Sequence, residues 1–248
     1  MSRGFRIWDT HTHLGEALHS GRKQSAEDLL RVMDREHIER SVCIPFPVVA
    51  DYRATHDLIA AAVRSYPDRL SGTVCLDPFV PRDRFDDEVR RCAEEFGFRA
   101  LKLQPQYQAL NPLWPRNDFF FEAAVRYNLP LIVHTGAGAP YALPSLYISV
   151  ARRFPDLRVI LAHAGGGIYV GECIVAADVC PNIYVELSSL MPHHVAEVVR
   201  SVPSHRLLIG SDLLESTAME IGKIVELDAP RGVKEDILWN TAERLFGG

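Results

Sequence analysis

The sequence predicts a (β/α)8 barrel that forms one domain over residues 1–248. Eight short runs rich in Val, Ile, Leu and Phe are typical of buried parallel strands. Segments with helical spacing separate these runs, and no shift in composition marks a second domain. An open doubly wound sheet usually has about five or six strands, so the alternation favours a closed barrel.

The elements follow one another in regular order along the chain. Strands are expected to begin near Phe5, Arg40, Leu70, Phe98, Pro130, Arg158, Ile183 and Arg206. The clearest helical patterns cover Ser25–His37, Ala54–Tyr66, Pro81–Phe96 and Asn117–Tyr127. Weaker amphipathic patterns predict helices over Tyr141–Phe154, Tyr169–Cys180 and Pro192–Val202, and a final helix over Val233–Phe246. In the first helix the apolar residues recur three or four positions apart, and the remaining positions are mostly Arg, Asp and Glu.

Composition excludes several classes of protein. With 47% hydrophobic and 24% charged residues, the chain is neither disordered, collagen-like nor a coiled coil. Its net charge of −5 and the lack of a basic stripe argue against a nucleic-acid partner. No stretch approaches the roughly 20 apolar residues of a membrane span, and the first residues contain no apolar leader. Five scattered cysteines without a CxxC pair indicate reduced thiols and a cytoplasmic location. The expected partners are a small-molecule substrate and a second copy of the chain, held through an apolar patch on the outer helices.

Histidine and aspartate recur at the expected carboxyl ends of the strands, where barrels of this kind hold their active sites. The first strand ends Asp9-Thr10-His11-Thr12-His13. Because side chains alternate along a strand, His11 and His13 share a face, and Asp9 is expected on the same face. The ends of the fifth, sixth and eighth strands add His134, His163 and Asp212.

This set of residue types predicts a metal site. Imidazole and carboxylate are ligands for zinc, or less selectively for iron, manganese or cobalt, and three or four of them leave a position for water. A single strand histidine is more often structural, but four histidines and an aspartate at strand ends together favour metal binding. Asp9 either orients a metal-bound histidine or is a buried carboxylate with another partner.

Five segments resemble the amidohydrolase superfamily. They are Trp8–His13, Leu101–Leu103, Leu131–Gly136, Leu161–Gly167 and Leu208–Asp212. The chain resembles most closely the amidohydrolase-related branch, which contains aminocarboxymuconate-semialdehyde decarboxylase, related aromatic-acid decarboxylases and hydrolases of lactones and other carbonyl compounds. The ending Trp239–Gly247 is also similar to that branch, so the resemblance spans almost the whole chain.

The resemblance implies a divalent metal, most simply one Zn²⁺, held by His11, His13, His134 and Asp212. His163 would activate the attacking water or polarise the substrate, and in a two-metal site it would become a ligand. Asp212 would also act as the proton shuttle, a role worth about 10²–10⁴-fold in rate.

Lys102 ends the fourth strand and allows three interpretations. Some superfamily members carry a carboxylated lysine there that bridges two metals. A free ammonium beside a dication is repelled, so an unmodified Lys102 either lies back from the ion or binds an anionic substrate. A lysine extending along the barrel rim is the third interpretation. The branch resemblance favours an unmodified lysine and one metal.

Two residues depart from the branch pattern, and both are expected to line the substrate pocket. Gln104 stands where relatives often have histidine, and Glu186 where a shorter aspartate is common. The loop Pro105–Arg116 could close over a flat or carboxylated substrate, with Arg116 as the binding cation. Alternatively, it is an exposed, proline-stiffened loop with no binding role.

Three functions are consistent with these residues. Hydrolysis of an amide, ester or lactone by a metal-activated water is favoured, with Asp212 and His163 moving protons. The alternative is metal-dependent decarboxylation of an aromatic or enol acid, with Lys102 or Arg116 holding the carboxylate. A non-catalytic metal-binding barrel would predict an incomplete ligand set. The chain contains neither a GxSxG elbow nor a GxGxxG motif, which excludes a serine nucleophile of that type and a dinucleotide cofactor.

Overall fold

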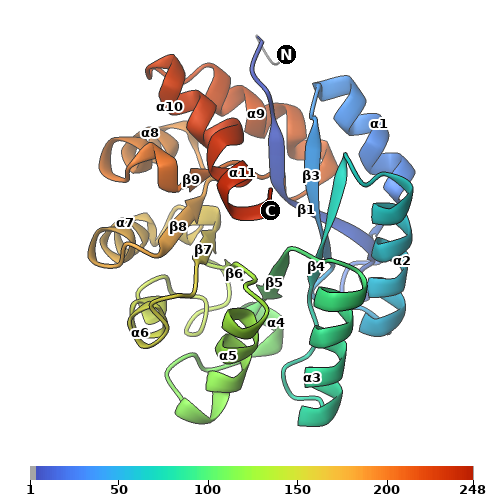
Figure 1. Cartoon of the computed structure of the whole chain (residues 1–248). Coiled ribbons are helices and arrows are strands. Elements are labelled where there is room, and N and C mark those ends of the chain that lie inside the picture. Colours follow the sequence, from blue (N-terminus) through green and yellow to red (C-terminus); the bar gives the residue numbers. More distant parts are fainter. Residues whose placement is uncertain (1–3, 248) are drawn as a thin grey trace.

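The computed structural model describes residues 4–247, so the outermost residues of the domain expected over 1–248 lie outside it. Eight strands pair in parallel, in the order of the chain (Figure 1). They are β1 (Trp8–Glu16), β3 (Arg40–Pro45), β4 (Leu70–Val74), β5 (Ala100–Leu103), β6 (Leu131–His134), β7 (Val159–Ala162), β8 (Ile183–Glu186) and β9 (Leu207–Leu208). The short β2 (Lys23–Gln24) pairs antiparallel with the end of β1.

Backbone contacts between the first and last strands close the barrel. The Thr10 amide donates to the Ile209 carbonyl at 3.0 Å, and the Asp212 amide donates to the His11 carbonyl at 2.7 Å. The predicted (β/α)8 barrel is therefore confirmed. The closure also brings the end of β9 beside the histidines of β1.

The helices form a ring outside the strands (Figure 1). They are α1 (Ala26–Glu36), α2 (Tyr52–Ser65), α3 (Arg82–Arg90), α4 (Pro105–Gln108), α5 (Asp118–Arg126), α6 (Leu146–Arg153), α7 (Val170–Val179), α8 (Pro192–Ser201), α9 (Thr217–Val225), α10 (Arg231–Glu235) and α11 (Thr241–Phe246). A capping box begins α1, in which the Ser25 side chain accepts from the Asp28 amide. The sequence did not predict α9, because the buried polar residues Thr217 and Glu220 interrupt its apolar spacing. Among residues 4–247, no helix is long and apolar enough to cross a membrane.

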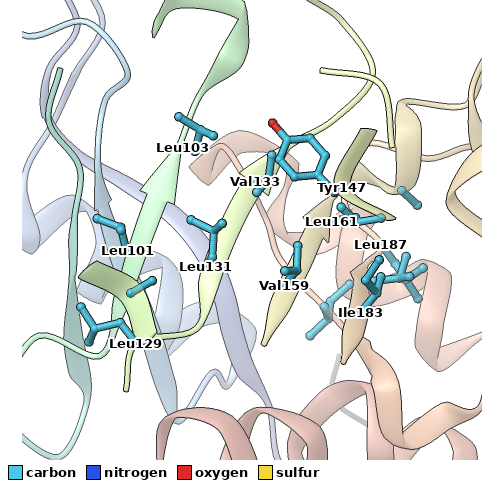
Figure 2. Close-up of a cluster of buried hydrophobic side chains, with 14 of the residues drawn as sticks. Leu101, Leu103, Leu129, Leu131, Val133, Tyr147, Val159, Leu161, Ile183 and Leu187 are labelled. Atoms are coloured by element: carbon cyan, nitrogen blue, oxygen red, sulfur yellow. The ribbon is translucent and has the colours of Figure 1, made fainter. Parts of the chain in front are cut away.

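Strand alternation divides the core into two layers. Outward side chains such as Leu101, Leu131 and Leu161 pack beneath the helices (Figure 2). Inward side chains, including Val42, Ala100, Ile132, Ile160 and Leu208, pack with Trp8, Trp239 and Phe246 in a second cluster. Further along the strands the inward positions become polar, and these are the positions of the histidines. The apolar interior thus supports a polar floor at the carboxyl end.

A bulge in β1 corrects the expectation for Asp9. The pairing register with β3 shifts between Asp9 and Thr12, so simple alternation does not hold across this segment. The Asp9 carboxylate accepts hydrogen bonds from the His11 amide at 3.1 Å, from the Ser211 amide at 3.0 Å and from the Ser211 hydroxyl at 2.6 Å. Burial raises the Asp9 pKa to about 7 despite these bonds. Asp9 therefore ties β1 to β9 instead of joining the histidine side chains.

A buried ionic network fixes α2 and α3 against the end of β4. His56 Nδ1 donates to Glu88 at 2.7 Å, and His56 Nε2 accepts from the Cys75 amide at 3.1 Å. Arg91 and Arg53 also donate to the Glu88 carboxylate, each at 2.6 Å. Burial alone would raise the Glu88 pKa, but the hydrogen bonds from His56 and Arg91 outweigh burial and lower that pKa to about 2.

Replacing Glu88 by glutamine should lower the free energy of unfolding at pH 7 by roughly 3 kcal/mol, because the arginines lose a buried counter-charge. The folded-state pKa lies below the ordinary value of 4.5, so this stabilisation is full above about pH 5 and is lost as the pH falls towards 2. Urea unfolding between pH 3 and 7 measures it. Glu235→Gln, which breaks an exposed pair with Arg231, is the control and should cost less than about 1 kcal/mol. A Glu88→Gln effect that does not vary with pH would contradict the assignment.

Candidate active site

Three potential ligand atoms converge where β1 and β9 end. His13 Nε2 lies 3.3 Å from Asp212 Oδ1, and His11 Nε2 lies 3.7 Å from the same oxygen. All three residues belong to one group whose ligand atoms lie within 4.8 Å of one another. The structure thus brings together three of the four residues that the sequence proposed as ligands.

Hydrogen bonds at the opposite ring nitrogens fix both imidazoles. His11 Nδ1 lies 3.1 Å from a Glu186 carboxylate oxygen, and His13 Nδ1 lies 3.2 Å from the Pro45 carbonyl oxygen. These oxygens only accept, so each Nδ1 carries a proton, and each Nε2 is directed towards Asp212. Burial lowers the His11 pKa well below its ordinary value, which keeps that ring neutral.

The two Nε2 atoms and the carboxylate oxygen converge on one point, where a cation could bind all three. Burial would raise the Asp212 pKa, but the neighbouring histidines, His13 first, lower it well below its ordinary value, so the carboxylate stays ionised. Nitrogen and oxygen donors in this arrangement, with the distal nitrogens hydrogen-bonded, fit a divalent transition metal. The donor chemistry of the described residues therefore matches the expected metal.

Lys102 lies in the same cluster. Its Nζ donates to His11 Nε2 at 3.0 Å, and its side chain is 1% exposed. Burial lowers the Lys102 pKa to about 8. Lys102 does not lie back from the proposed ligands, so a metal ion on His11 Nε2 requires this contact to be given up.

His134 stands at the edge of the cluster. Its Nε2 donates to the Ala137 carbonyl at 3.0 Å, and its ring lies edge-on to that of His163, with centroids 4.8 Å apart. Burial lowers the His134 pKa to about 3. The structure does not place a His134 nitrogen in the group formed by the three convergent ligand atoms.

Glu186 does not line the pocket as the sequence analysis expected. Its side chain is 1% exposed, and its carboxylate accepts from His11 Nδ1, the His163 amide and both the amide and the hydroxyl of Ser188. Gly210 makes room for it: a Cβ there would lie 2.8 Å from a Glu186 oxygen. Glu186 is thus a positioning residue. Its strand position points into the barrel interior, so its side chain does not reach the rim where the pocket opens.

The Glu186 carboxylate also positions His163, through the Ser188 hydroxyl. Its Nδ1 lies 2.8 Å from the Ser188 hydroxyl, which donates to Glu186 at 2.9 Å. The backbone of His163 is left-handed, with φ 64°, a conformation uncommon outside glycine. Burial lowers its pKa to about 4, so the ring is neutral and presents Nε2 as an acceptor.

A pocket of about 290 Å³ opens over this cluster. His13, His163, His134, Asp212 and Gln104 line it from the strand ends, and Gln104 therefore lies where the sequence placed it. The remaining walls come from the β1–β2 connection with His19 and Arg22, from Phe46 after β3, and from Gln106 and Tyr107 of α4.

Aromatic contacts shape this pocket. Phe46 stacks on His13 with centroids 5.0 Å apart, and His19 meets Tyr107 at 4.8 Å. Gln108 fixes α4, because it donates to the Leu76 carbonyl at 2.9 Å and accepts from the Gln104 amide at 2.7 Å. The start of the loop that the sequence singled out therefore forms one wall.

The structure does not bring Arg116 to the pocket. Its exposed guanidinium stacks over the Trp114 ring at 4.3 Å, and it is absent from the pocket lining. Arg22 is the arginine found there, and its Nη1 donates to Glu215 at 2.6 Å. Sequence reasoning missed Arg22 because it lies in a short run of polar and glycine residues, and its partner is 193 residues away.

Comparisons with known proteins agree with this arrangement. A closed (β/α)8 barrel with histidines and an aspartate converging at its strand ends defines a metal-dependent enzyme. The chain belongs to the amidohydrolase family, whose model matches residues 8–248. No curated protein matches it.

Solved structures share the fold at low sequence identity. A 5-carboxyvanillate decarboxylase from Novosphingobium aromaticivorans, complexed with manganese and 4-hydroxy-3-methoxy-5-nitrobenzoic acid, is 15% identical with a TM-score of 0.78, over 99% of this chain and 97% of that one. A 4-oxalomesaconate hydratase from Rhodopseudomonas palustris is 18% identical, with a TM-score of 0.74 over 97% and 95% of the two chains. A TIM-barrel protein from Bordetella bronchiseptica is 20% identical, with a TM-score of 0.79 over 97% and 98%.

Glu186→Gln should weaken metal binding about 10- to 100-fold, because an amide NH₂ can donate to His11 Nδ1 and move the ring proton to Nε2. Competition with a chelator measures the affinity for Mn²⁺ and Zn²⁺. Glu220→Gln is the matched control: Glu220 is equally buried but pairs with Lys223 and contacts no histidine. Equal metal affinity in the two variants would show that Glu186 does not orient His11.

Proposed function

We propose that the protein is a metal-dependent decarboxylase of a small planar carboxylic acid. The observation that supports this most directly is the position of Arg22 in a pocket with aromatic walls, beside the convergent donors of His11, His13 and Asp212. Of the described residues lining this pocket, Arg22 is the only arginine or lysine. A guanidinium is well matched to a carboxylate, and flat walls suit a flat substrate.

One divalent metal, Mn²⁺ or Zn²⁺, is proposed to bind His11, His13 and Asp212, with His134 as a further candidate ligand and an unmodified Lys102 displaced from His11. When bound, the ion would act as a Lewis acid that draws electron density from the oxygens of the substrate. Several solved structures with this fold are decarboxylases with bound manganese, which supports both the metal and the reaction.

The protein's own groups supply binding and proton transfer. Arg22 would hold a carboxylate at the mouth of the pocket, and Phe46 with Tyr107 would flank the substrate plane. Asp212 directs Oδ1 towards the histidines, and Oδ2 makes no hydrogen bond within residues 4–247. Asp212 would take up a proton from solvent and deliver it to the substrate carbon that loses CO₂. The bond from this carbon to the carboxylate group breaks, its electron pair stays on the substrate carbon to form the new C–H bond, and CO₂ leaves. His163, with Nδ1 held by Ser188, would direct Nε2 to a polar substituent of the substrate.

Hydrolysis of an amide, ester or lactone, which the sequence analysis favoured, is the second candidate. Two acceptors at the pocket, Asp212 Oδ2 and His163 Nε2, could take the proton of an attacking water. A non-catalytic barrel is the least supported reading, since the convergent donor set is intact. The three functions are distinguished by assays of hydroxybenzoic acids, enol acids, esters and lactones with Mn²⁺- or Zn²⁺-loaded protein. Release of CO₂ supports the proposal, and cleavage of esters or lactones alone overturns it in favour of hydrolysis. No turnover favours a binding role.

We further propose a cytoplasmic location and a homodimer. All five cysteines are free and buried, as expected in a reducing compartment. On α7, Val175 and Val179 are exposed one turn apart and offer an apolar patch to a second copy.

Arg22→Gln should raise KM for the acid substrate at least 10-fold and change kcat less, because Arg22 binds the substrate and does not carry the transferred proton. Steady-state kinetics on the first acid that the enzyme turns over test this. Lys23→Gln is the control, since Lys23 is the adjacent cation but pairs with Glu16 outside the pocket. A lower kcat with an unchanged KM would contradict this role for Arg22.

Asp212→Asn should lower kcat by about 10²–10⁴-fold through loss of the proton carrier. Because Asp212 is also a proposed ligand, activity is measured at saturating Mn²⁺ with the bound metal quantified in the same samples. A variant that retains near-normal turnover would contradict the assigned role, and circular dichroism verifies that the barrel remains folded.

A further inference from the structure

A second cavity lies at the amino-terminal end of the barrel, opposite the active site. It measures about 300 Å³ and lies where β3, β4 and β5 begin. Arg40, Arg69 and Arg99 line it, and each stands at or immediately before the first residue of one of these strands. None of the proposed metal ligands lines this cavity. The cavity is therefore not part of the candidate active site.

The charges around this cavity are unbalanced. Asp68 is the one acidic residue among the described residues that line it. Arg69 is paired with Asp34 at 3.0 Å, but within residues 4–247 Arg40 and Arg99 form neither an ion pair nor a side-chain hydrogen bond. The Arg40 guanidinium instead lies 4.8 Å from the Trp8 ring centroid and 5.9 Å from that of Trp239. These stacking contacts use the face of the guanidinium and leave its N–H groups available to a ligand.

The two tryptophans add further unpaired donors. Trp8, which lines the cavity, is 2% exposed, and its buried Nε1 has no hydrogen-bond partner. Trp239 packs against it, with ring centroids 5.3 Å apart, and its Nε1 is also buried without a partner. Buried donors are satisfied in the great majority of protein structures, and each exception calls for an explanation. The cavity-lining guanidiniums of Arg40 and Arg99 donate and do not accept, so a ligand that complements them is an acceptor.

We propose that this cavity binds a small organic anion through a phosphate or carboxylate group. The guanidiniums of Arg40 and Arg99 supply charge and hydrogen bonds, and the Trp8 ring forms part of the cavity wall. Apolar side chains, including Val63, Phe96 and Phe246, line the rest of the cavity, and its volume exceeds that of an inorganic oxyanion. The ligand therefore has an apolar part attached to its anionic group.

Tryptophan fluorescence of the purified full chain tests this proposal. Trp8 lines the cavity, Trp239 packs against Trp8, and the third tryptophan, Trp114, contacts neither the cavity nor Trp8 among the described contacts. Phenyl phosphate, benzoate and inorganic phosphate are titrated at constant ionic strength, with calorimetry to give the stoichiometry. We expect saturable binding of one aromatic anion per chain, tighter than inorganic phosphate; the tighter of phenyl phosphate and benzoate identifies the anionic group.

Arg40→Gln and Arg99→Gln should each weaken this binding at least 10-fold. Arg99 is exposed, so its replacement keeps the test valid even if Arg40→Gln unfolds the chain. Arg116→Gln, which also removes an arginine stacked on a tryptophan, is the matched control and should bind as the wild type does. Absence of saturable binding, equal binding in all variants, or a loss confined to Arg22→Gln would overturn the proposal; the last result would place the anion in the active-site pocket.

Discussion

The hydrogen bond from His11 Nδ1 to the buried Glu186 carboxylate determines how this site works. It fixes the proton on Nδ1 and leaves Nε2 as a lone pair 3.7 Å from Asp212 Oδ1. The same carboxylate oxygen accepts from the His163 amide and the Ser188 hydroxyl. One buried acid thus sets the orientation of a proposed ligand and of the histidine beside the substrate pocket. Removal of the Glu186 charge would therefore disturb the orientation of His11 and of His163 together.

The barrel supplies the backbone geometry that this arrangement requires. Closure of β1 against β9 holds Asp212 beside the histidines, because the Asp212 backbone amide donates a hydrogen bond to the His11 carbonyl. Asp212 and His163 both have left-handed backbones, with φ of 60° and 64°, at the ends of their strands. Such conformations cost of order 1–3 kcal/mol for residues other than glycine, and they cluster at active sites because the surrounding structure enforces them. The stability of the apolar interior below offsets this local strain.

The sequence predicted those features that depend on local periodicity. Strand alternation placed His11 and His13 together, and the end of the eighth strand supplied Asp212, as the structure shows. It failed for Asp9, because a bulge changes the register without a clear sequence signal. It also proposed Arg116 and missed Arg22, because the partner that positions Arg22, Glu215, lies 193 residues away in the chain. Whether an inward residue such as Glu186 reaches solvent depends on the depth of its layer in the barrel, which periodicity does not define.

The metal content of the chain tests the central claim most directly. Elemental analysis is made on protein purified without a histidine tag or added metal, and again after dialysis against Mn²⁺ or Zn²⁺, with the intact mass recorded for a carbon dioxide adduct on Lys102. We expect one equivalent of divalent metal per chain, no adduct, and loss of the metal when His11 and His13 are replaced by alanine. Protein that binds no metal under any of these conditions, or a double variant that retains it fully, would contradict the account.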